Sequence, residues 1–257
     1  MRQTSGKPDL FLGPVERSTS RVGSFISSDI DLPDKCLSFG LAFVGGFGDA
    51  AGFVLAKTFT GHVTGSLVLG TIAIAAHAWR DALAHFSATT CFLAGIPLSV
   101  VIARLRAAWP LWPFLPMALG IEVILITVAY FALAFRSPTG VEIFVACLSL
   151  ALGLQNAAFR RTGGISVHTN YLTGMITGLL SEEAERHSFG LALRPSKLSE
   201  PKIGLLYGIW GWFFVGAVTG ATVVFRFKQP GILAVVPVLF WLIFRNLTFL
   251  PQVDSAG

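Results

Sequence analysis

The sequence predicts an all-α polytopic membrane protein with six full transmembrane helices, two short or re-entrant helices and two structural repeats. Three observations predict this fold class: the composition, the long apolar runs and a set of motifs that occurs twice. Of the 257 residues, 53% are hydrophobic and only 13% are charged, and the mean hydropathy is +0.69. A soluble domain carries about 25% charged residues. These charged residues are too few to form the surface of a water-soluble protein of this size. The protein is therefore expected to lie in a lipid bilayer.

The apolar runs locate the expected helices. A hydrocarbon core about 30 Å thick is crossed by about 20 apolar residues in a helix. Two stretches, 62–78 and 171–181, are apolar but marginal in length. If both of these also cross, the chain has eight spans instead of six. The six stretches that are long enough are 37–55, 86–105, 113–135, 141–159, 203–225 and 231–249.

One transmembrane domain is expected over residues 36–250. Residues 1–35 are polar and contain no uninterrupted apolar core of the kind found in signal peptides, so they predict a disordered cytoplasmic tail. Residues 251–257 form a second short tail. The segment 182–202 mixes acidic and basic side chains and is expected to be a solvated loop.

The basic residues predict that both termini are cytoplasmic. With six spans, only five of the 19 Lys and Arg residues fall on the side opposite the N-terminus, and the other fourteen share its side. Cytoplasmic loops carry this excess of positive charge. With eight spans the bias is weaker. The five residues on the opposite side are Lys57, Arg80, Arg136, Arg226 and Lys228.

Three short matches in the same order indicate an internal repeat. GFGDAA at 46–51 aligns with GLQNAA at 153–158, at an offset of 107. HVTG at 62–65 aligns with YLTG at 171–174, and FLAG at 92–95 resembles FFVG at 213–216. The halves are then about 32–140 and 141–250. Three spans in each half make the repeats inverted, whereas four make them parallel.

Asp49 is the first candidate site residue, and Asn156 occupies the matching place in the second half, with Gln155 before it. A carboxylate at the centre of a membrane helix costs about 2.5–3.5 kcal/mol on insertion scales. The glycines around Asp49 loosen the helix and expose carbonyl groups. One interpretation is that Asp49 and Asn156 bind a small solute or ion. The other is that they hydrogen-bond to each other as a structural contact.

The connectors that follow both motifs are rich in Thr and Gly. The first contains Thr60, His62 and Thr64, and the second contains Tyr171 and Thr173. A short helix that begins at such a turn presents free N–H groups and its positive dipole end, which suit an anionic group. The plainer interpretation is that the threonines only cap the helices.

Three further groups have alternative interpretations. Arg160 either anchors the end of its span at the cytoplasmic surface or pairs with Asp49 or a carboxylate substrate. His62 and His168 can titrate near neutral pH or form ordinary polar contacts. Glu122 is a second intramembrane carboxylate and a candidate proton carrier, although its place near the start of its span would let it reach the interface.

Other site classes have no support in the sequence. It contains no phosphate-binding loop, no nucleophile elbow and no cluster with metal-ligand spacing, so no catalytic residue, metal or cofactor is expected. The three cysteines lie singly in or beside apolar spans. The net charge of +5 is spread over loops and forms no basic stripe, so a nucleic-acid partner is not expected.

The motifs at these sites resemble those of the YoaK-like family of bacterial membrane proteins, a domain of unknown function. The segments that carry the resemblance are GGFGDAAGF (45–53), FTGHVTG (59–65), GLQNAAFRRTGG (153–164) and TNYLTG (169–174). One departure is Ser66, where the family pattern has Asn. The resemblance implies a multi-pass protein of the bacterial cell (inner) membrane and carries over no activity.

The leading functional hypothesis is a small-solute secondary transporter with a site at mid-membrane where the two repeats meet. The expected partners are the bilayer and a small solute or ion, and a homo-oligomer is compatible with the sequence. Two alternatives are a membrane-embedded enzyme and a non-transporting scaffold.

Overall fold

Apolar helices make up most of the chain that the structure describes. The structure is a computed structural model and describes residues 35–108, 113–159, 161–162, 165–166, 174, 176–178, 180–181, 184 and 200–249. The helices are α2 (Lys35–Ala56), α3 (Val63–Ala75), α4 (Trp79–Ala108), α5 (Phe114–Ala134), α6 (Pro138–Ala158), α8 (Glu200–Phe227), the 3₁₀ helix η1 (Gln229–Val235) and α9 (Val236–Phe249). The two-residue strands β1 (Arg161–Thr162) and β2 (Ile165–Ser166) pair antiparallel.

Six helical segments are long and apolar enough to cross a membrane within the described residues, which confirms the predicted fold class. α3 has 13 residues and is therefore only about 20 Å long at 1.5 Å per residue. It is a short helix, as the first marginal stretch predicted. The other marginal stretch, 171–181, lies largely outside the described residues.

Two helix boundaries differ from the prediction. α4 begins at Trp79, seven residues before the predicted start, because helical sequence continues through polar residues that the hydropathy pattern does not mark. The last span is not one α-helix, since η1 precedes α9. Pro237 explains the change. A proline has no N–H to donate, and its ring clashes with the carbonyl group four residues earlier, so the turn before it is not α-helical.

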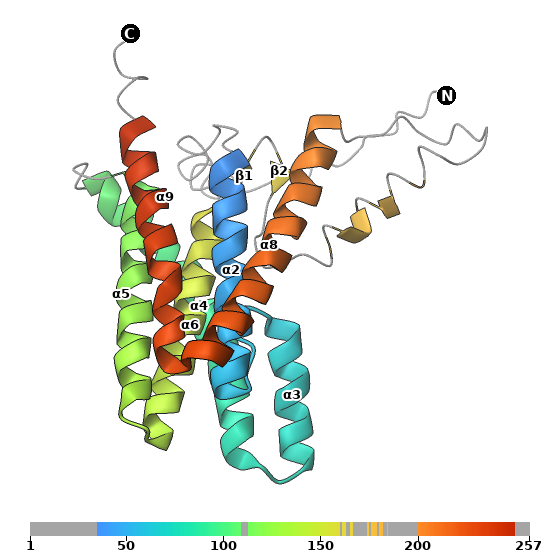
Figure 1. The fold of residues 1–257 in the computed structure, drawn as a ribbon, viewed down its shortest axis with the longest axis vertical. Helices are drawn as coiled ribbons and strands as arrows, with labels where there is room; N and C mark the ends of the chain where they lie inside the picture. Colours follow the sequence, from blue (N-terminus) through green and yellow to red (C-terminus); the bar gives the residue numbers. More distant parts are fainter. Residues whose placement is uncertain are drawn as a thin grey trace, which may run out of the picture.

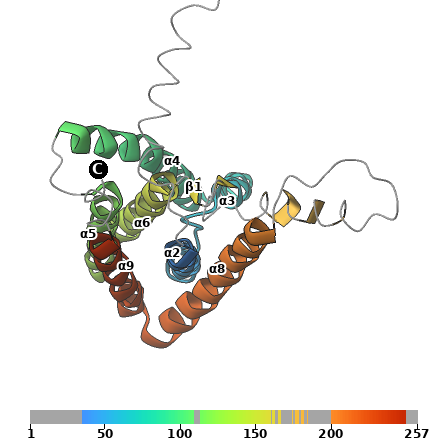
Figure 2. The same ribbon diagram turned by 90° about the horizontal axis from the view of Figure 1, so that it is seen from above.

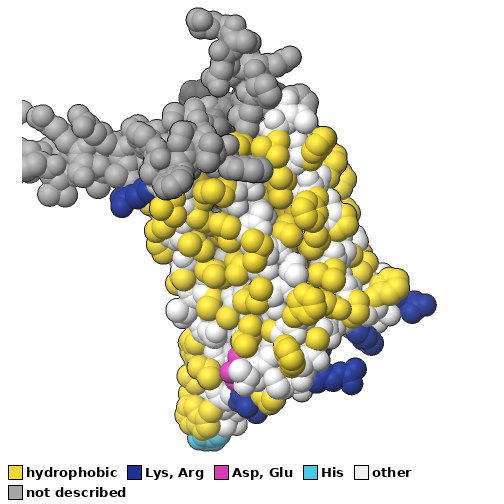
Figure 3. Space-filling view, turned by 90° about the vertical axis from the view of Figure 1, so that its left-hand side faces the viewer, with side chains coloured by type: hydrophobic (Ala, Val, Ile, Leu, Met, Phe, Trp, Pro, Cys, Tyr) yellow, Lys and Arg dark blue, Asp and Glu magenta, His cyan; other side chains and the backbone are white. Residues whose placement is uncertain are grey.

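α2 lies at the centre of the arrangement. Figure 2 shows it surrounded by α6, α8 and α9, while α3 packs beside α4 at one edge. Its buried side chains, including Leu41 and Phe47, join the main hydrophobic core. Large apolar side chains also cover the outside, and Figure 3 shows them as a broad band with basic side chains at both ends. This distribution matches the cross-section of a bilayer.

α2 and α6 run antiparallel. The Gln155 side chain donates from Nε2 to the carbonyl oxygen of Leu41 at 2.7 Å, and Gly52 packs against Leu148 further along α2. α2 begins and α9 ends at the same end of the bundle (Figure 1). The connections that follow α2, α3, α5 and α8 lie toward the opposite end.

Two helix pairs meet through glycines with almost identical geometry. Where α2 meets α8, a Cβ at Gly46 would lie 2.1 Å from the carbonyl oxygen of Phe213. Where α4 meets α6, a Cβ at Gly153 would lie 2.0 Å from the carbonyl oxygen of Phe92. Both pairs therefore bring backbone against backbone, which only glycine allows. Gly46 and Gly153, and likewise Phe213 and Phe92, are the positions that the sequence alignment equates.

Candidate functional site

Asp49 lies deep in the bundle. It is 14 residues from the start of α2 and seven from its end, which places it about 21 Å and 10 Å from the two ends. Only 4% of the residue is exposed. A carboxylate at this depth needs donors from the protein itself, because neither lipid nor bulk water supplies them.

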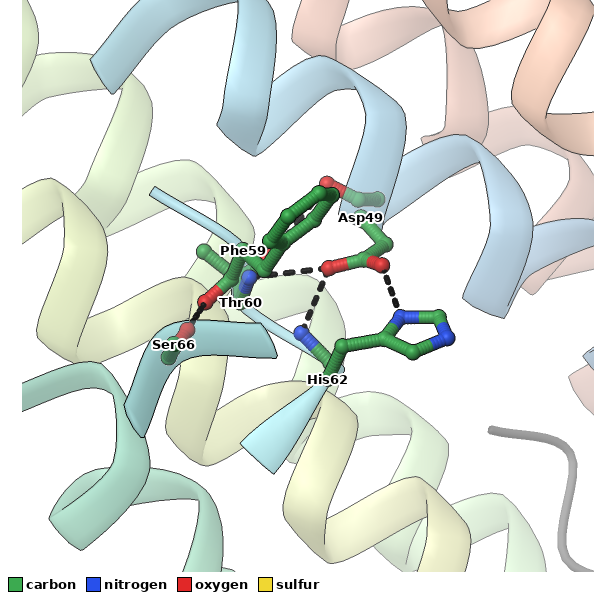
Figure 4. Close-up of polar contacts among 7 residues, drawn as sticks. Asp49, Phe59, Thr60, His62 and Ser66 are labelled. Carbon is green, nitrogen blue, oxygen red and sulfur yellow. Dashed lines mark hydrogen bonds and ion pairs between the residues drawn. The ribbon is translucent and has the colours of Figure 1, made fainter. Parts of the chain in front are cut away.

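The donors come from the connector between α2 and α3. Asp49 Oδ1 accepts the backbone N–H of Thr60 at 2.8 Å and that of Gly61 at 2.7 Å. Oδ2 pairs with Nδ1 of His62, and Figure 4 shows all these groups converging on the carboxylate. The N–H groups before α3 therefore bind an anionic group from the protein itself, the carboxylate of Asp49.

The connector reaches Asp49 because the chain turns back after α2. Lys57, at the end of α2, has a φ of 56°, in the left-handed region that reverses a helix end. Thr60 then returns against Gly52, where a Cβ would lie only 2.8 Å from the Thr60 side chain. Thr60 Oγ1 also donates to the carbonyl oxygen of Gly48 at 3.4 Å. α3 consequently begins at the depth of Asp49, inside the bundle.

His62 is the most accessible member of the Asp49–Thr60–Gly61–His62 cluster. Its side chain is 36% exposed, against 6% for that of Asp49. The ring lies between two aromatic rings, with centroids 5.9 Å from Phe59 and 6.0 Å from Phe213 of α8. The hydrogen bond to Asp49 raises the pKa of His62 above its ordinary 6.5, although burial acts in the opposite direction. The pair therefore favours an imidazolium facing a carboxylate.

The predicted partners from the second half do not join this cluster in the structure. Gln155 is buried and bonds through Nε2 to α2, while its Oε1 and the Oδ1 of Asn156 have no hydrogen-bond partner among the described residues. Gly48, next to Asp49, packs against Leu152 of α6. Asn156 is four residues beyond Leu152, about 6 Å further along the helix. Within the described chain, no hydrogen bond joins Asp49 to Asn156, so the proposed structural contact between them is not present.

Of the remaining predicted residues, two lie within the described part of the chain and the others lie outside it. Thr64 lies in the first turn of α3 and is exposed. Glu122 is completely buried in α5 and does not reach the interface, contrary to what its place near the start of the span suggested. Arg160, His168, Tyr171 and Thr173 lie outside the described residues.

Several members of the site are not recognisable from side-chain motifs. Gly61 contributes only a backbone N–H, and Phe213 comes from a helix about 150 residues away in sequence. Ser66, the departure from the family pattern, donates from Oγ to the carbonyl oxygen of Phe59 at 2.6 Å and so fixes the connector. The one available signal was the Thr–Gly turn, which indicates free N–H groups but not their acceptor.

Comparison with known proteins gives two matches. Residues 37–244 match a family described as "Protein of unknown function (DUF1275)". The UPF0700 transmembrane protein YoaK of Bacillus subtilis (strain 168) is 26% identical over 151 residues, which cover 58% of this chain and 67% of that protein. No solved structure matches.

Proposed function

This chain belongs to the DUF1275 family, whose function is unknown, and on that premise we propose that it is a secondary transporter of a small solute. The observation that carries the proposal is the buried Asp49–His62 pair at the start of a helix that begins inside the bundle. Transporters built from repeats bind their solutes near the bilayer midplane, where interrupted helices place N–H groups and charges at one point. The α2–α3 connector has this arrangement.

The packing of the two halves supports an inverted repeat. α2 and α6 hold equivalent motifs and run antiparallel, as inverted halves require. The contact of Gly46 with Phe213 is also repeated by the contact of Gly153 with Phe92. An internal symmetry of this kind gives a protein two related conformations, open to opposite sides of the membrane.

His62 is the group that we expect to meet the solute. Asp49 already has donors at both oxygens, so a cation would have to displace one of them. His62 is partly exposed and lies beside Phe213 of α8 and the start of α3. Loss of the His62 proton would remove the positive charge that pairs with the Asp49 carboxylate. The pair thus offers a proton-dependent change of charge at the binding site.

The second half supplies acceptors. The Oε1 of Gln155 and the Oδ1 of Asn156 are buried with no donor in the described structure. Unpaired buried acceptors are costly, and a solute with N–H or O–H donors would satisfy them. A solute that bridges the His62 side and this amide pair would contact both halves. Arg160, Tyr171 and Thr173 of the second connector stay in the proposal on the sequence alone, as does Thr64.

Flux measurements test the proposal. A thermal-shift screen first selects solutes that stabilise the purified protein, and uptake of each is then measured in proteoliposomes. We expect Asp49→Asn and His62→Gln to lower uptake at least tenfold, because both remove the charge pair. Asp81→Asn is the matched control, since Asp81 lies exposed in the first turn of α4.

Three results would contradict parts of the proposal. Equal uptake by the wild type and Asp49→Asn would exclude the pair from the transport step. Solutes that bind but never cross would favour a non-transporting membrane scaffold. Chemical conversion of the bound solute would favour a membrane-embedded enzyme.

A further inference from the structure

Glu122 is a second buried carboxyl group, far from the Asp49 cluster in sequence and unused by the proposed site. It lies in α5 and has 0% exposure. Neither of its carboxyl oxygens has a hydrogen-bond partner within the described residues. Asp49 shows how this chain stabilises a buried carboxylate, with two backbone N–H donors and a histidine. Glu122 has none of them.

The register of α5 against α6 gives the level of Glu122 in the bundle. A Cβ at Gly140 of α6 would lie 2.3 Å from the carbonyl oxygen of Ala132 of α5, which fixes the register of this antiparallel pair. Ten residues from that point along each helix place Glu122 opposite residue 150. Glu122 therefore lies about 15 Å along α5 from this contact, inside the packed part of the bundle.

No charge on the packed elements compensates a carboxylate at this place. Glu142 is the fifth residue of α6, about 12 Å from the level of Glu122 by the same register. η1 carries no charged or titratable side chain. The other charged or titratable groups on α5 and on the helices that contact it are Arg80, Asp81, His85, Cys91, Arg104 and Arg106 on α4, Tyr130 on α5, Cys147 on α6 and Arg245 on α9. Within the part of the chain whose side chains the structure describes, no hydrogen bond reaches either Glu122 oxygen.

We propose that Glu122 is a proton-binding site in its own right, which holds a proton as a neutral carboxylic acid between α5 and α6. An isolated ionised carboxylate in such surroundings is far more costly than a neutral acid. A proton also fits the donor set better than a metal cation does. Glu122 offers two oxygens, whereas Mg²⁺ and Ca²⁺ take six or more.

The site couples proton binding to the packing of two helices. To lose its proton to water, Glu122 must become hydrated, and this requires α5 and α6 to separate at the level of Glu122. The protonated form therefore favours the closed interface, and the ionised form favours an opened one. This inference stands apart from the proposed transport of a solute through the Asp49 cluster.

Infrared spectroscopy of the full-length protein in bilayers tests the protonation state directly. We expect the wild type at neutral pH to show a carboxylic-acid C=O band that is absent from Glu122→Gln. The band should disappear only at strongly alkaline pH and should not respond to added Na⁺. Glu142→Gln is the control, because Glu142 is partly exposed and lies 3.8 Å from Arg80, so its loss should leave the band unchanged.

Carbodiimide labelling gives a second readout. The carboxylic O–H adds across a C=N bond of dicyclohexylcarbodiimide, with the oxygen bonding to carbon and the proton moving to nitrogen, and the adduct rearranges to a stable N-acylurea. We expect mass spectrometry to find this adduct at Glu122 in the wild type and in Glu142→Gln. A water-soluble charged carbodiimide should not produce it.

Two outcomes would overturn the inference. Identical carbonyl spectra for the wild type and Glu122→Gln at neutral pH would show that Glu122 is ionised. Loss of the band or of the adduct on addition of Na⁺ would assign the site to a metal cation instead. Because Glu122→Gln has the shape and neutrality of the protonated acid, we expect it to fold, and a thermal transition equal to that of the wild type verifies this.

Discussion

Asp49 binds two kinds of partner, and they have different consequences for a mutation. The N–H groups of Thr60 and Gly61 are backbone donors that cannot be removed, and they have no other acceptor at this depth. His62 is a side chain that reaches a partly exposed position. A mutation that removes the Asp49 oxygen accepting these N–H groups therefore affects stability. A mutation that removes only the charge of Asp49 affects the proposed transport.

Asp49→Ala should destabilise the protein more than Asp49→Asn does. Alanine leaves two buried N–H groups unpaired, at a cost of about 2 kcal/mol or more. Asparagine keeps an Oδ1 that can accept both bonds and loses only the charge. Apparent melting temperatures of both variants in the same detergent provide the measurement. Equal melting temperatures would show that the connector does not depend on this acceptor.

His62 predicts a pH dependence of stability. Its pKa is raised in the folded protein, so its stabilising contribution is complete below the ordinary value of 6.5 and disappears as the pH rises through the higher folded value. The melting temperature of the wild type should therefore fall over a window above pH 6.5. His62→Gln should lack this fall, and His77→Gln, which changes an exposed histidine, should retain it. An unchanged fall in His62→Gln would assign the dependence to another group.

At this scale the sequence indicated the right residue types but not their partners. Asp49, Thr60 and His62 could be selected because charged and polar groups are rare in apolar segments. Their convergence could not be predicted, because Asp49 is bound mainly by backbone N–H groups, which every residue except proline carries. A hydrogen bond between Asp49 and Asn156 was one of two interpretations of their equivalent positions, and the described structure shows no such bond.

The helix pairs depend on glycines that allow backbone contact. Gly46→Ala and Gly153→Ala should each destabilise the protein by about 1–3 kcal/mol, because a Cβ would overlap a carbonyl oxygen that cannot move without displacing a helix. Gly211→Ala on α8 is the control, since no atom lies within 4 Å of its Cβ position. The melting temperature of Gly211→Ala should equal that of the wild type. A stable Gly153→Ala beside an unstable Gly46→Ala would argue against the equivalence of the two halves.

Elements were largely predictable from hydropathy, since six apolar runs became six spans. The start of α4 and the junction between η1 and α9 were not predictable in this way. The start of α4 includes Arg80, Asp81 and His85, which lower its hydropathy, and Pro237 changes the geometry of the turn before it without interrupting the apolar run. The depth at which α3 begins was also not predictable, because it depends on where Asp49 binds the connector.

The whole molecule gives a testable topology. Six spans place Lys57, Arg80 and Arg136 at one end of the bundle, opposite Arg104, whereas eight spans would place Lys57 and Arg80 on opposite sides. In a cysteine-free background, cysteines at the first three positions should react alike with an impermeant thiol reagent in intact cells. Arg104→Cys should react only after permeabilisation. All four positions are exposed. Opposite behaviour of Lys57→Cys and Arg80→Cys would favour eight spans.

At the scale of the molecule, the sequence was sufficient for the membrane class and for the family, because both depend on composition and short motifs that do not require coordinates. The solute was not predictable. Its recognition depends on the distance between the His62 side and the amides of α6, and this distance is set by helix register and crossing rather than by any local pattern.

The return of the chain to Asp49 also constrains how the protein is made. Synthesis proceeds from the N-terminus, so α2 leaves the ribosome before Thr60, Gly61 and His62 do. In that interval α2 offers the insertion machinery a bare carboxylate among glycines, with a penalty of about 2.5–3.5 kcal/mol at its centre. The penalty is relieved only when the next dozen residues arrive. α2 and the beginning of α3 are therefore expected to enter the bilayer together, as one cotranslational unit.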